Sequence, residues 1–271
     1  MKFLLIIFTA FLCFSCNNSV NPLDSERKNQ KAAVPFVNWV YIKSHYHDTT
    51  SFTEGFLFYK GELYESTGSP KDLPQTKSLL GLVDLNTGKI DVKVELDRKL
   101  FGEGIAVLNE KIFWLTYKTK TGLVYDLKTY EKIEEFILPT KEGWGLTTDG
   151  KSLIMSDGTN KLTYLDPETF DVIKEISVKE NNYEKDNLNE LEFINGYIYA
   201  NVWTTRTIVK IDPESAQVVG ILDLSALVEE ANDSYQNSLE MNGIAYDSVS
   251  NSVFITGKLW PNIFEIKLED N

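Results

Sequence analysis

Short apolar runs separated by turn residues occupy most of the chain. One repeated unit consists of an apolar run, an aspartate closely followed by turn residues, and a second alternating run. Aspartate with Pro, Asn, Ser, Thr or Gly behind it favours a hairpin, because these side chains cap the turn and tolerate its backbone angles. The unit recurs at Asp84, Asp126, Asp166 and Asp212, at intervals of 42, 40 and 46 residues. The pattern therefore predicts strands joined by hairpins at a nearly regular spacing.

A second repeated unit alternates with the first. It combines a small or polar motif, an apolar run, a turn and another apolar run, and it occurs five times. The copies are FTEGFLFYKGELYEST, FGEGIAVLNEKIFWLT, GWGLTTDGKSLIMSD, NELEFINGYIYANV and MNGIAYDSVSNSVFIT. About four short strands per repeat, with no helical period beyond a stretch near residues 226–231, are the signature of propeller blades. We therefore predict an all-β fold, a five-bladed β-propeller.

The last copy of the repeat is incomplete, since NIFEIKLEDN ends the chain where the next turn and outer strand should follow. The run VPFVNWVYIKSHYH, at residues 34–47, precedes the first full unit and has no partner of its own. We expect this N-terminal strand to close the ring by pairing with the last blade, which would remove the open edge of a linear array. A β-sandwich with inserted loops would also contain many short strands, but it does not explain the period.

The first sixteen residues, MKFLLIIFTAFLCFSC, combine one lysine with an apolar run too short to span a bilayer, which is typical of a secretory signal. The end of this run resembles a bacterial lipobox with Cys16 as the acylated residue, and ordinary cleavage is the alternative. Residues 17–33 are polar and lack a period, which predicts a flexible tether. The expected organisation is a signal at 1–16, the tether at 17–33 and the propeller domain at 34–271, in a periplasmic or cell-surface lipoprotein of a bacterium.

Composition narrows the class of partner. The chain has 271 residues, of which 42% are hydrophobic, enough for a sizeable core. Its 40 acidic and 27 basic residues give a formal net charge of -13, which would repel phosphate backbones, so we expect no nucleic-acid partner. No cysteine follows Cys16, so no disulfide can stabilise the folded part.

Residues at one phase of a propeller repeat form a ring around one end of the central channel. The phase just before the inner strand holds Glu54, Glu103, Trp144, Asn189 and Asn242, and a later phase holds Tyr117, Trp203 and Lys258. A purely structural scaffold would place small or apolar residues at most of these positions. Each residue taken singly could belong to the core or to the solvated surface, but the convergence of polar groups and aromatic walls favours a small-molecule pocket.

Seven short motifs in fixed order carry a family resemblance: FTEG, FGEG, GWGL, DGT, LNELE, NVW and TGKLWP. From about His47 to Leu268 the chain resembles the plant and bacterial type of glutaminyl cyclase, the glutamine cyclotransferases of the papaya latex kind. The resemblance implies a five-bladed propeller that converts N-terminal glutamine of peptides or proteins to pyroglutamate and releases ammonia. It also implies catalysis without a cofactor, and suggests a structural cation such as calcium in the channel, held by backbone carbonyls and waters. We expect a monomer, although the sequence itself does not reveal the oligomeric state.

The resemblance assigns the site. Glu103 would transfer the protons, and its flanking glycines would leave the carboxylate accessible to the substrate. Lys258 and the indole of Trp203 would donate to the oxyanion, while Asn189 and Glu54 would hold the ammonium or the amide. The expected substrate-binding residues are Phe52, Glu54, Phe101, Tyr117, Trp144 and Trp203, with Glu103, Lys258 and Asn189 as the catalytic set.

Two positions depart from the family pattern. The family commonly has Gln where this chain has Glu54, and Trp where it has Tyr117. A second carboxylate near Glu103 would raise the pKa of one of the pair and attract the ammonium, so Glu54 is an alternative base. Tyr117 in place of Trp retains an aromatic wall, but the smaller ring changes the depth of that wall and could change the substrate preference.

Other readings of the same residues stay open. His45 and His47 could form a metal pair, although no third ligand is evident and a structural role is favoured. A tethered propeller could bind N-terminal or amino-sugar ligands without turnover. A metal-dependent, lactonase-like hydrolase could place Glu54, Glu103, Asn189 and Asn242 around an ion, and chelator sensitivity would distinguish it.

Overall fold

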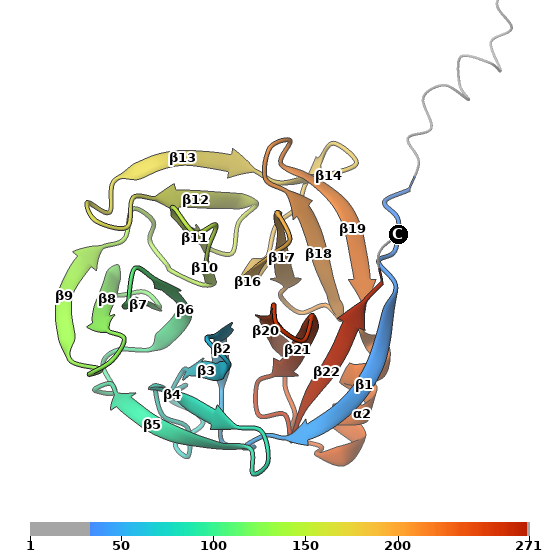
Figure 1. Cartoon of the computed structure of the whole chain (residues 1–271), viewed down its shortest axis with the longest axis horizontal. Coiled ribbons are helices and arrows are strands. Elements are labelled where there is room, and N and C mark those ends of the chain that lie inside the picture. Colours follow the sequence, from blue (N-terminus) through green and yellow to red (C-terminus); the bar gives the residue numbers. More distant parts are fainter. Residues whose placement is uncertain (1–32, 270–271) are drawn as a thin grey trace, which may run out of the picture. The chain divides into compact units, whose positions relative to one another are not determined.

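The structure, a computed structural model, describes residues 33–269. Five sheets of mainly antiparallel strands surround a central axis, and the innermost strands begin at Thr53, Gly102, Leu146, Leu188 and Met241 (Figure 1). Blade 1 holds β2 (Thr53–Tyr59), β3 (Glu62–Thr67), β4 (Leu79–Asp84) and β5 (Lys89–Glu95). Blade 2 holds β6 (Gly102–Leu108), β7 (Lys111–Thr116), β8 (Thr121–Asp126) and β9 (Lys132–Ile137). Blade 3 holds β10 (Leu146–Thr148), β11 (Leu153–Ser156), β12 (Lys161–Leu165) and β13 (Val172–Ser177).

The last two blades carry additions. Blade 4 holds β16 (Leu188–Ile194), β17 (Tyr197–Val202), β18 (Thr207–Asp212) and β19 (Gln217–Asp223), extended by β14 (Lys179–Glu180) and β15 (Tyr183–Glu184). Blade 5 holds β20 (Met241–Asp247), β21 (Ser252–Gly257), β22 (Asn262–Leu268) and β1 (Trp39–Tyr46). Helix α2 (Ser225–Ser234) follows β19. The predicted five-bladed β-propeller is confirmed.

The N-terminal strand closes the ring. Strand β1 pairs antiparallel with β22, from Trp39 opposite Leu268 to Tyr46 opposite Asn262 (Figure 1). Just before it, the Val37 amide donates to the Ile221 carbonyl at 2.9 Å, which joins the segment to β19 of blade 4. The segment therefore links the outer strands of two blades, and the predicted closure is confirmed.

The repeated aspartates form the hairpins that their pattern predicts. The Oδ1 atom of each accepts the amide two residues on, at 2.9 Å for Asp84, 2.9 Å for Asp126, 2.8 Å for Asp166 and 3.1 Å for Asp212. These and neighbouring hydrogen bonds lower the pKa of all four carboxyl groups. The hairpins set the strand spacing that brings each inner strand back to the axis.

Apolar side chains fill the spaces between neighbouring blades. Trp114 and Ile105 of blade 2 pack with Leu80 of blade 1, and all three are buried. Trp260 and Phe264 of blade 5 belong to a cluster shared with blade 4 and α2. Because each blade is packed on both faces, the starting ends of the inner strands are held in fixed positions around the channel.

Side chains of blade 4 bind the free edges of other inner strands. Glu190 Oε1 accepts the Phe56 amide at 3.2 Å, and its Oε2 accepts the Ile244 amide at 2.8 Å. Glu192 Oε1 accepts the Tyr246 amide at 2.9 Å. Burial raises the pKa of Glu190 well above its usual value and that of Glu192 to about 8. These carboxyl groups satisfy buried amides, and so hold β2 and β20 in place.

The two histidines make structural pairs. His47 Nε2 lies 3.1 Å from Glu65 Oε1, and Nδ1 lies 2.9 Å from the Trp260 carbonyl, with the His47 and Glu65 side chains fully buried. His45 Nε2 lies 3.0 Å from Glu265 Oε2. Burial lowers the pKa of His47, but the charge and hydrogen bond of Glu65 outweigh it and the pKa is raised. Within residues 33–269 no three His, Cys, Asp or Glu side chains gather as a metal site.

Replacing Glu65 by Gln should destabilise the fold in a pH-dependent way. His47 has a raised pKa in the folded protein, so the pair stabilises most below the unfolded pKa of about 6.5, and this contribution disappears as pH rises through the folded pKa. We expect the variant to lose roughly 2 kcal/mol of unfolding free energy near pH 6 and much less near pH 9, measured by urea denaturation. Glu95→Gln, in an exposed pair with Lys77, is the control and should cost under about 1 kcal/mol. An equal loss at both pH values would contradict the role of His47.

Candidate active site

All nine residues predicted to form the site line one cavity of about 180 Å³. They come from every blade, at the starts of inner strands and in the loops that follow the second strands. The nine are Phe52, Glu54, Phe101, Glu103, Tyr117, Trp144, Asn189, Trp203 and Lys258. The convergence expected from the repeat phase is therefore present at one mouth of the channel.

Glu54 is held between a cation and an amide. Its Oε1 lies 2.8 Å from Lys258 Nζ, and its Oε2 accepts a hydrogen bond from Asn242 Nδ2 at 3.0 Å. Asn242, the fifth residue predicted for the ring, lies behind Glu54 and is absent from the cavity wall. Lys258 Nζ also lies 4.6 Å from the centre of the Phe52 ring. The ammonium is thus fixed by a carboxylate and an aromatic face.

The charges of this pair depend on burial and on each other. Burial raises the pKa of Glu54 to about 7, although Lys258 opposes the shift. Burial lowers the pKa of Lys258, but the negative charges of Glu54 and Glu103 outweigh this and the pKa is raised. Lys258 therefore stays cationic at neutral pH, while Glu54 titrates there.

Glu103 is buried without a polar partner. Its side chain has no hydrogen bond or ion pair with any other residue in the described part of the chain, and the residue is 4% exposed. Burial raises its pKa well above the usual value, and the nearby charge of Glu54 raises it further. Both effects disfavour ionisation of Glu103, while the charge of Lys258 opposes them.

The glycines beside Glu103 have a packing role that the sequence interpretation missed. A Cβ atom on Gly102 would lie 2.6 Å from the Trp114 ring, and one on Gly104 would lie 2.4 Å from the Leu146 amide nitrogen. The Gly104 amide donates to the Trp144 carbonyl at 2.8 Å. Glycine is required here because β6 lies against its neighbours, which in turn fixes the direction of the carboxylate.

Aromatic rings build the walls. The rings of Trp144 and Trp203 pack edge to face, with 5.6 Å between their centroids. The ring centroids of Phe101 and Tyr117 are 5.7 Å apart. The glycine of the DGT motif, Gly158, has φ +80° and lies so close to Trp144 that a Cβ would be 2.7 Å from its ring. The motif therefore positions a wall residue.

Asn189 is placed by main-chain bonds. Its carbonyl accepts the Ser156 hydroxyl at 2.8 Å, and the same hydroxyl oxygen accepts the Gly145 amide at 2.8 Å. The side chain is 3% exposed, and its Oδ1 accepts no hydrogen bond from the residues that the structure describes. A buried amide without a partner is suited to bind a polar substrate.

Sequence reasoning missed two residues near the cavity. Glu142 Oε2 accepts the Trp144 indole N–H at 3.0 Å and lies close to Lys118, with 3.7 Å between Oε1 and Nζ. Glu240 precedes β20, and its carbonyl accepts the Lys258 amide at 2.9 Å. Its charge contributes to raising the pKa of Glu54. The spacing in EGW, with an acid two residues before the tryptophan, is the one sequence signal that could have indicated Glu142.

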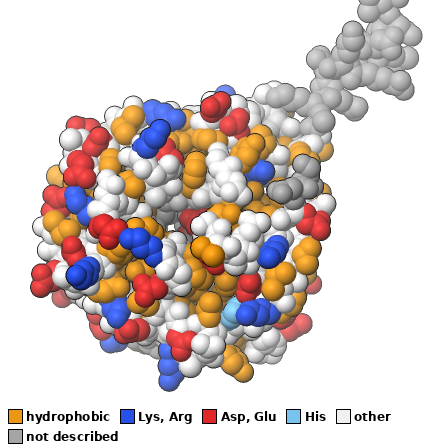
Figure 2. Space-filling view, viewed as in Figure 1, with side chains coloured by type: hydrophobic (Ala, Val, Ile, Leu, Met, Phe, Trp, Pro, Cys, Tyr) orange, Lys and Arg blue, Asp and Glu red, His pale blue; other side chains and the backbone are white. Residues whose placement is uncertain are grey.

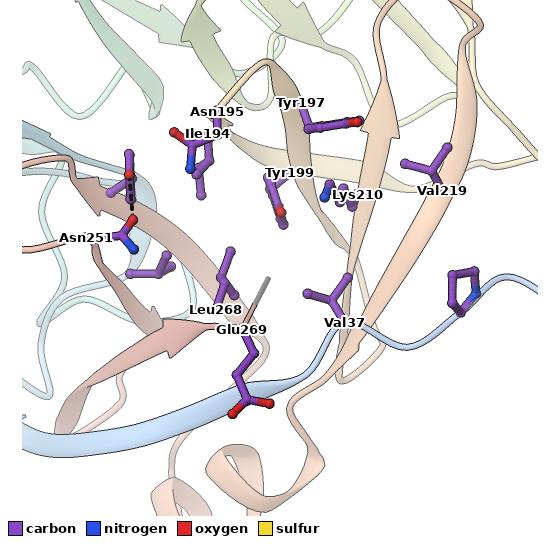
Figure 3. A pocket seen from close by; sticks show the side chains of 13 residues that line it. Val37, Ile194, Asn195, Tyr197, Tyr199, Lys210, Val219, Asn251, Leu268 and Glu269 are labelled. Atoms are coloured by element: carbon purple, nitrogen blue, oxygen red, sulfur yellow. Dashed lines mark hydrogen bonds between the residues drawn. The ribbon is translucent and has the colours of Figure 1, made fainter. Parts of the chain in front are cut away.

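A second cavity, of about 310 Å³, lies between blades 4 and 5 (Figure 3). Tyr197, Tyr199 and Lys210 line it, with Lys210 Nζ 4.1 Å from the Tyr197 ring centre. None of the nine predicted site residues lines it, and its two charged residues, Lys210 and Glu269, form no ion pair with each other. The smaller cavity is therefore the better candidate for chemistry.

The fold and the site define the class: a β-propeller with an acid–base pocket at one mouth of its channel. Residues 12–268 match the model of the glutamine cyclotransferase family, and the chain belongs to this family.

The relatives agree with this assignment. The chain is 41% identical over 225 residues to a glutaminyl-peptide cyclotransferase of Arabidopsis thaliana, covering 82% of this chain and 69% of that protein. It also resembles the crystal structure of Myxococcus xanthus glutaminyl cyclase, with a TM-score of 0.80 and 32% identity over 88% of this chain and 99% of the other. The resemblance carried by the seven motifs is confirmed.

Proposed function

We propose that this chain is a glutaminyl-peptide cyclotransferase, which closes N-terminal glutamine to pyroglutamate and releases ammonia. The observation that carries the proposal is the convergence of a partnerless buried carboxyl group, Glu103, with the cation of Lys258 and aromatic walls in one small cavity. At about 180 Å³ the cavity is smaller than a typical ligand pocket and suits a single residue, with the rest of the peptide outside.

The reaction requires proton transfer between two nitrogens. A free α-amino group has a pKa near 8, so most of it is protonated at neutral pH and cannot attack. After attack on the γ-amide carbon, the leaving nitrogen departs only when it receives a proton. Glu103, in the wall of the cavity, would relay hydrogen from the attacking to the leaving nitrogen, help that is worth on the order of 10²–10⁴ in rate.

The remaining residues stabilise and orient the substrate. Lys258 and Trp203 are donors for the developing oxyanion, and the Trp203 indole has no acceptor among residues 33–269. Trp144 offers a flat wall to the aliphatic part of the glutamine side chain. Asn189 and Glu54 would bind the ammonium or the amide, and Phe52, Phe101 and Tyr117 complete the wall.

No catalytic cofactor enters this proposal, and a calcium ion in the channel would be structural. Both carboxyl oxygens of Glu190 accept hydrogen bonds from main-chain amides, so this side chain is already engaged without an ion. Since no acidic or histidine cluster occurs between residues 33 and 269, such an ion would rely on main-chain carbonyls and water.

Ammonia release from a Gln-Phe dipeptide, measured with and without chelator, tests the function. We expect release at the same initial rate in both conditions, and any bound calcium should appear in the metal content and in the melting temperature. Binding without release would favour a non-catalytic binding module. Loss of all turnover in chelator would favour a metal-dependent hydrolase, and either result would contradict the proposal.

We also propose that the protein is exported and lipid-anchored through Cys16, and acts as a monomer on peptides or proteins with N-terminal glutamine. The support is the sequence of residues 1–33, of which 1–32 lie outside the described residues. In the described part, no helix has the length and apolar character needed to cross a membrane. Acidic and basic side chains are interspersed on the face shown in Figure 2, without a broad basic patch there. The mass of the mature N-terminus would test the anchor, and an unmodified Cys16 would contradict it.

A further inference from the structure

We propose that Glu142 is a positioning residue: it holds the indole ring of Trp144 as an apolar wall for the glutamine side chain, and so sets how tightly the substrate binds. This inference rests on the proposed cyclisation, and it adds a residue that does not itself line the cavity. Glu142 acts through Trp144 and takes no part in proton transfer.

The main chain of Trp144 is fixed independently of the Glu142 side chain. Its amide donates to the Ser156 carbonyl at 3.1 Å, and its carbonyl accepts the Gly104 amide at 2.8 Å. The neighbouring Gly145 amide donates to the Ser156 hydroxyl oxygen at 2.8 Å. These bonds tie Trp144 to blades 2 and 3, but they do not determine the direction of its ring.

Two contacts set that direction. The indole N–H of Trp144 donates to Glu142 Oε2 at 3.0 Å, a bond directed at a residue outside the cavity wall. On another part of the ring, a Cβ atom on Gly158 would lie only 2.7 Å away, so the main chain there limits the space. Packing against Gly158 therefore restricts where the ring can lie, and the hydrogen bond to Glu142 selects its orientation.

The same hydrogen bond gives the two tryptophans of the cavity different roles. The one polar atom of the Trp144 side chain is occupied by Glu142, so this ring presents an apolar surface to the substrate. The Trp203 indole N–H donates no hydrogen bond within residues 33–269 and stays available. Without Glu142, the Trp144 N–H would lose its acceptor and the ring would adopt other rotamers, so part of the wall would be lost.

A neighbouring lysine supports Glu142 only weakly. Lys118 Nζ lies 3.7 Å from Glu142 Oε1 and 4.4 Å from the centre of the Tyr117 ring. The Lys118 side chain is 64% exposed, and ion pairs of exposed side chains contribute little. We therefore expect the hydrogen bond, and not the ion pair, to hold the ring, which makes Lys118→Met a matched control.

The test measures kcat and KM for ammonia release from Gln-Phe by Glu142→Met, whose unbranched side chain has no strong acceptor. Contacts with the wall exist in both the bound substrate and the transition state, so their loss should raise KM about fivefold and change kcat less than about twofold. Glu142→Gln keeps an acceptor oxygen and should restore KM to within about twofold of wild type. An equal rise of KM in Glu142→Gln and Glu142→Met would overturn the inference, because charge and not the hydrogen bond would then be responsible.

A double-mutant cycle separates positioning of the ring from a general structural role. Trp144→Phe keeps an aromatic wall without the N–H, so adding Glu142→Met to this variant should change KM less than about twofold. A further rise of about fivefold in the Trp144→Phe background would overturn the inference, since Glu142 would then act on the substrate by another route.

The indole N–H signals in NMR spectra give a second readout, which does not depend on activity. The signal that is missing from Trp144→Phe identifies Trp144, and it should move upfield in Glu142→Met and stay in place in Lys118→Met. An unchanged signal in Glu142→Met would overturn the inference. Failure of wild type to release ammonia while this shift is observed would instead overturn the proposed function, and would leave the hydrogen bond that positions Trp144 in place.

Discussion

Glu103→Gln is expected to abolish measurable ammonia release, with kcat/KM lowered by about 10³-fold or more. The amide of glutamine has the same shape but can neither give a proton to the leaving nitrogen nor recover one from the attacking nitrogen. The measurement is ammonia release from Gln-Phe dipeptides at neutral pH. Glu110→Gln, an exposed glutamate paired with Lys60, is the matched control and should keep full activity.

The same variant should fold at least as well as wild type. Because burial raises the pKa of Glu103 above its unfolded value, folding becomes less favourable as pH rises above the unfolded pKa of about 4.3, and this penalty levels off once pH exceeds the folded pKa. The melting temperature of Glu103→Gln should therefore equal or exceed that of wild type, and the difference should widen with pH. Full activity in Glu103→Gln would remove Glu103 from the mechanism and make Glu54 the first candidate to replace it.

Lys258→Ala is expected to lower kcat about 100-fold, equivalent to about 3 kcal/mol, with a much smaller change in KM. The ammonium helps most when charge develops on the oxyanion, and in the free protein it is paired with Glu54 at 2.8 Å. Its removal should also raise the pKa of Glu54, because the ammonium opposes the effect of burial on that carboxyl group. Separate measurement of kcat and KM checks the prediction.

Lys258→Met separates charge from volume. It retains an unbranched apolar side chain over Phe52, so its turnover should be as low as that of Lys258→Ala if the ammonium is what matters. Recovery of turnover by Met, or a rise in KM with unchanged kcat, would mean that Lys258 shapes the cavity or binds substrate without acting on the transition state.

The sequence was sufficient to predict the blade count and the closure, for a local reason. Each hairpin aspartate binds its own turn amides, as Asp84 does with Asn86, so the period is encoded within a few residues. The incomplete last repeat and the unpartnered run at 34–47 likewise indicated the pairing of β1 with β22. Repeat phase then converted sequence position into proximity, which placed all nine residues in one cavity.

Interactions that depend on distant side chains could not be predicted in this way. The hydrogen bond from Asn242 to Glu54 joins residues 188 positions apart in the sequence. The hydrogen bonds that Glu190 accepts from β2 and β20 join three different blades. The sequence suggests that the glycines beside Glu103 leave its carboxylate accessible, but it does not reveal their close packing against Trp114 and Leu146. The added β14–β15 hairpin on β19 had no signal in the repeat.

A labelling experiment tests the central claim most directly. A peptide that begins with glutamine is prepared with isotopically labelled nitrogen in the side-chain amide and incubated with the wild-type protein, and both products are examined by mass spectrometry. The account predicts that all label leaves as ammonia, that the peptide gains no oxygen from water, and that Glu103→Gln yields neither product. Label retained in the peptide, or oxygen from labelled water entering it to give glutamate, would contradict ring closure by the α-amine.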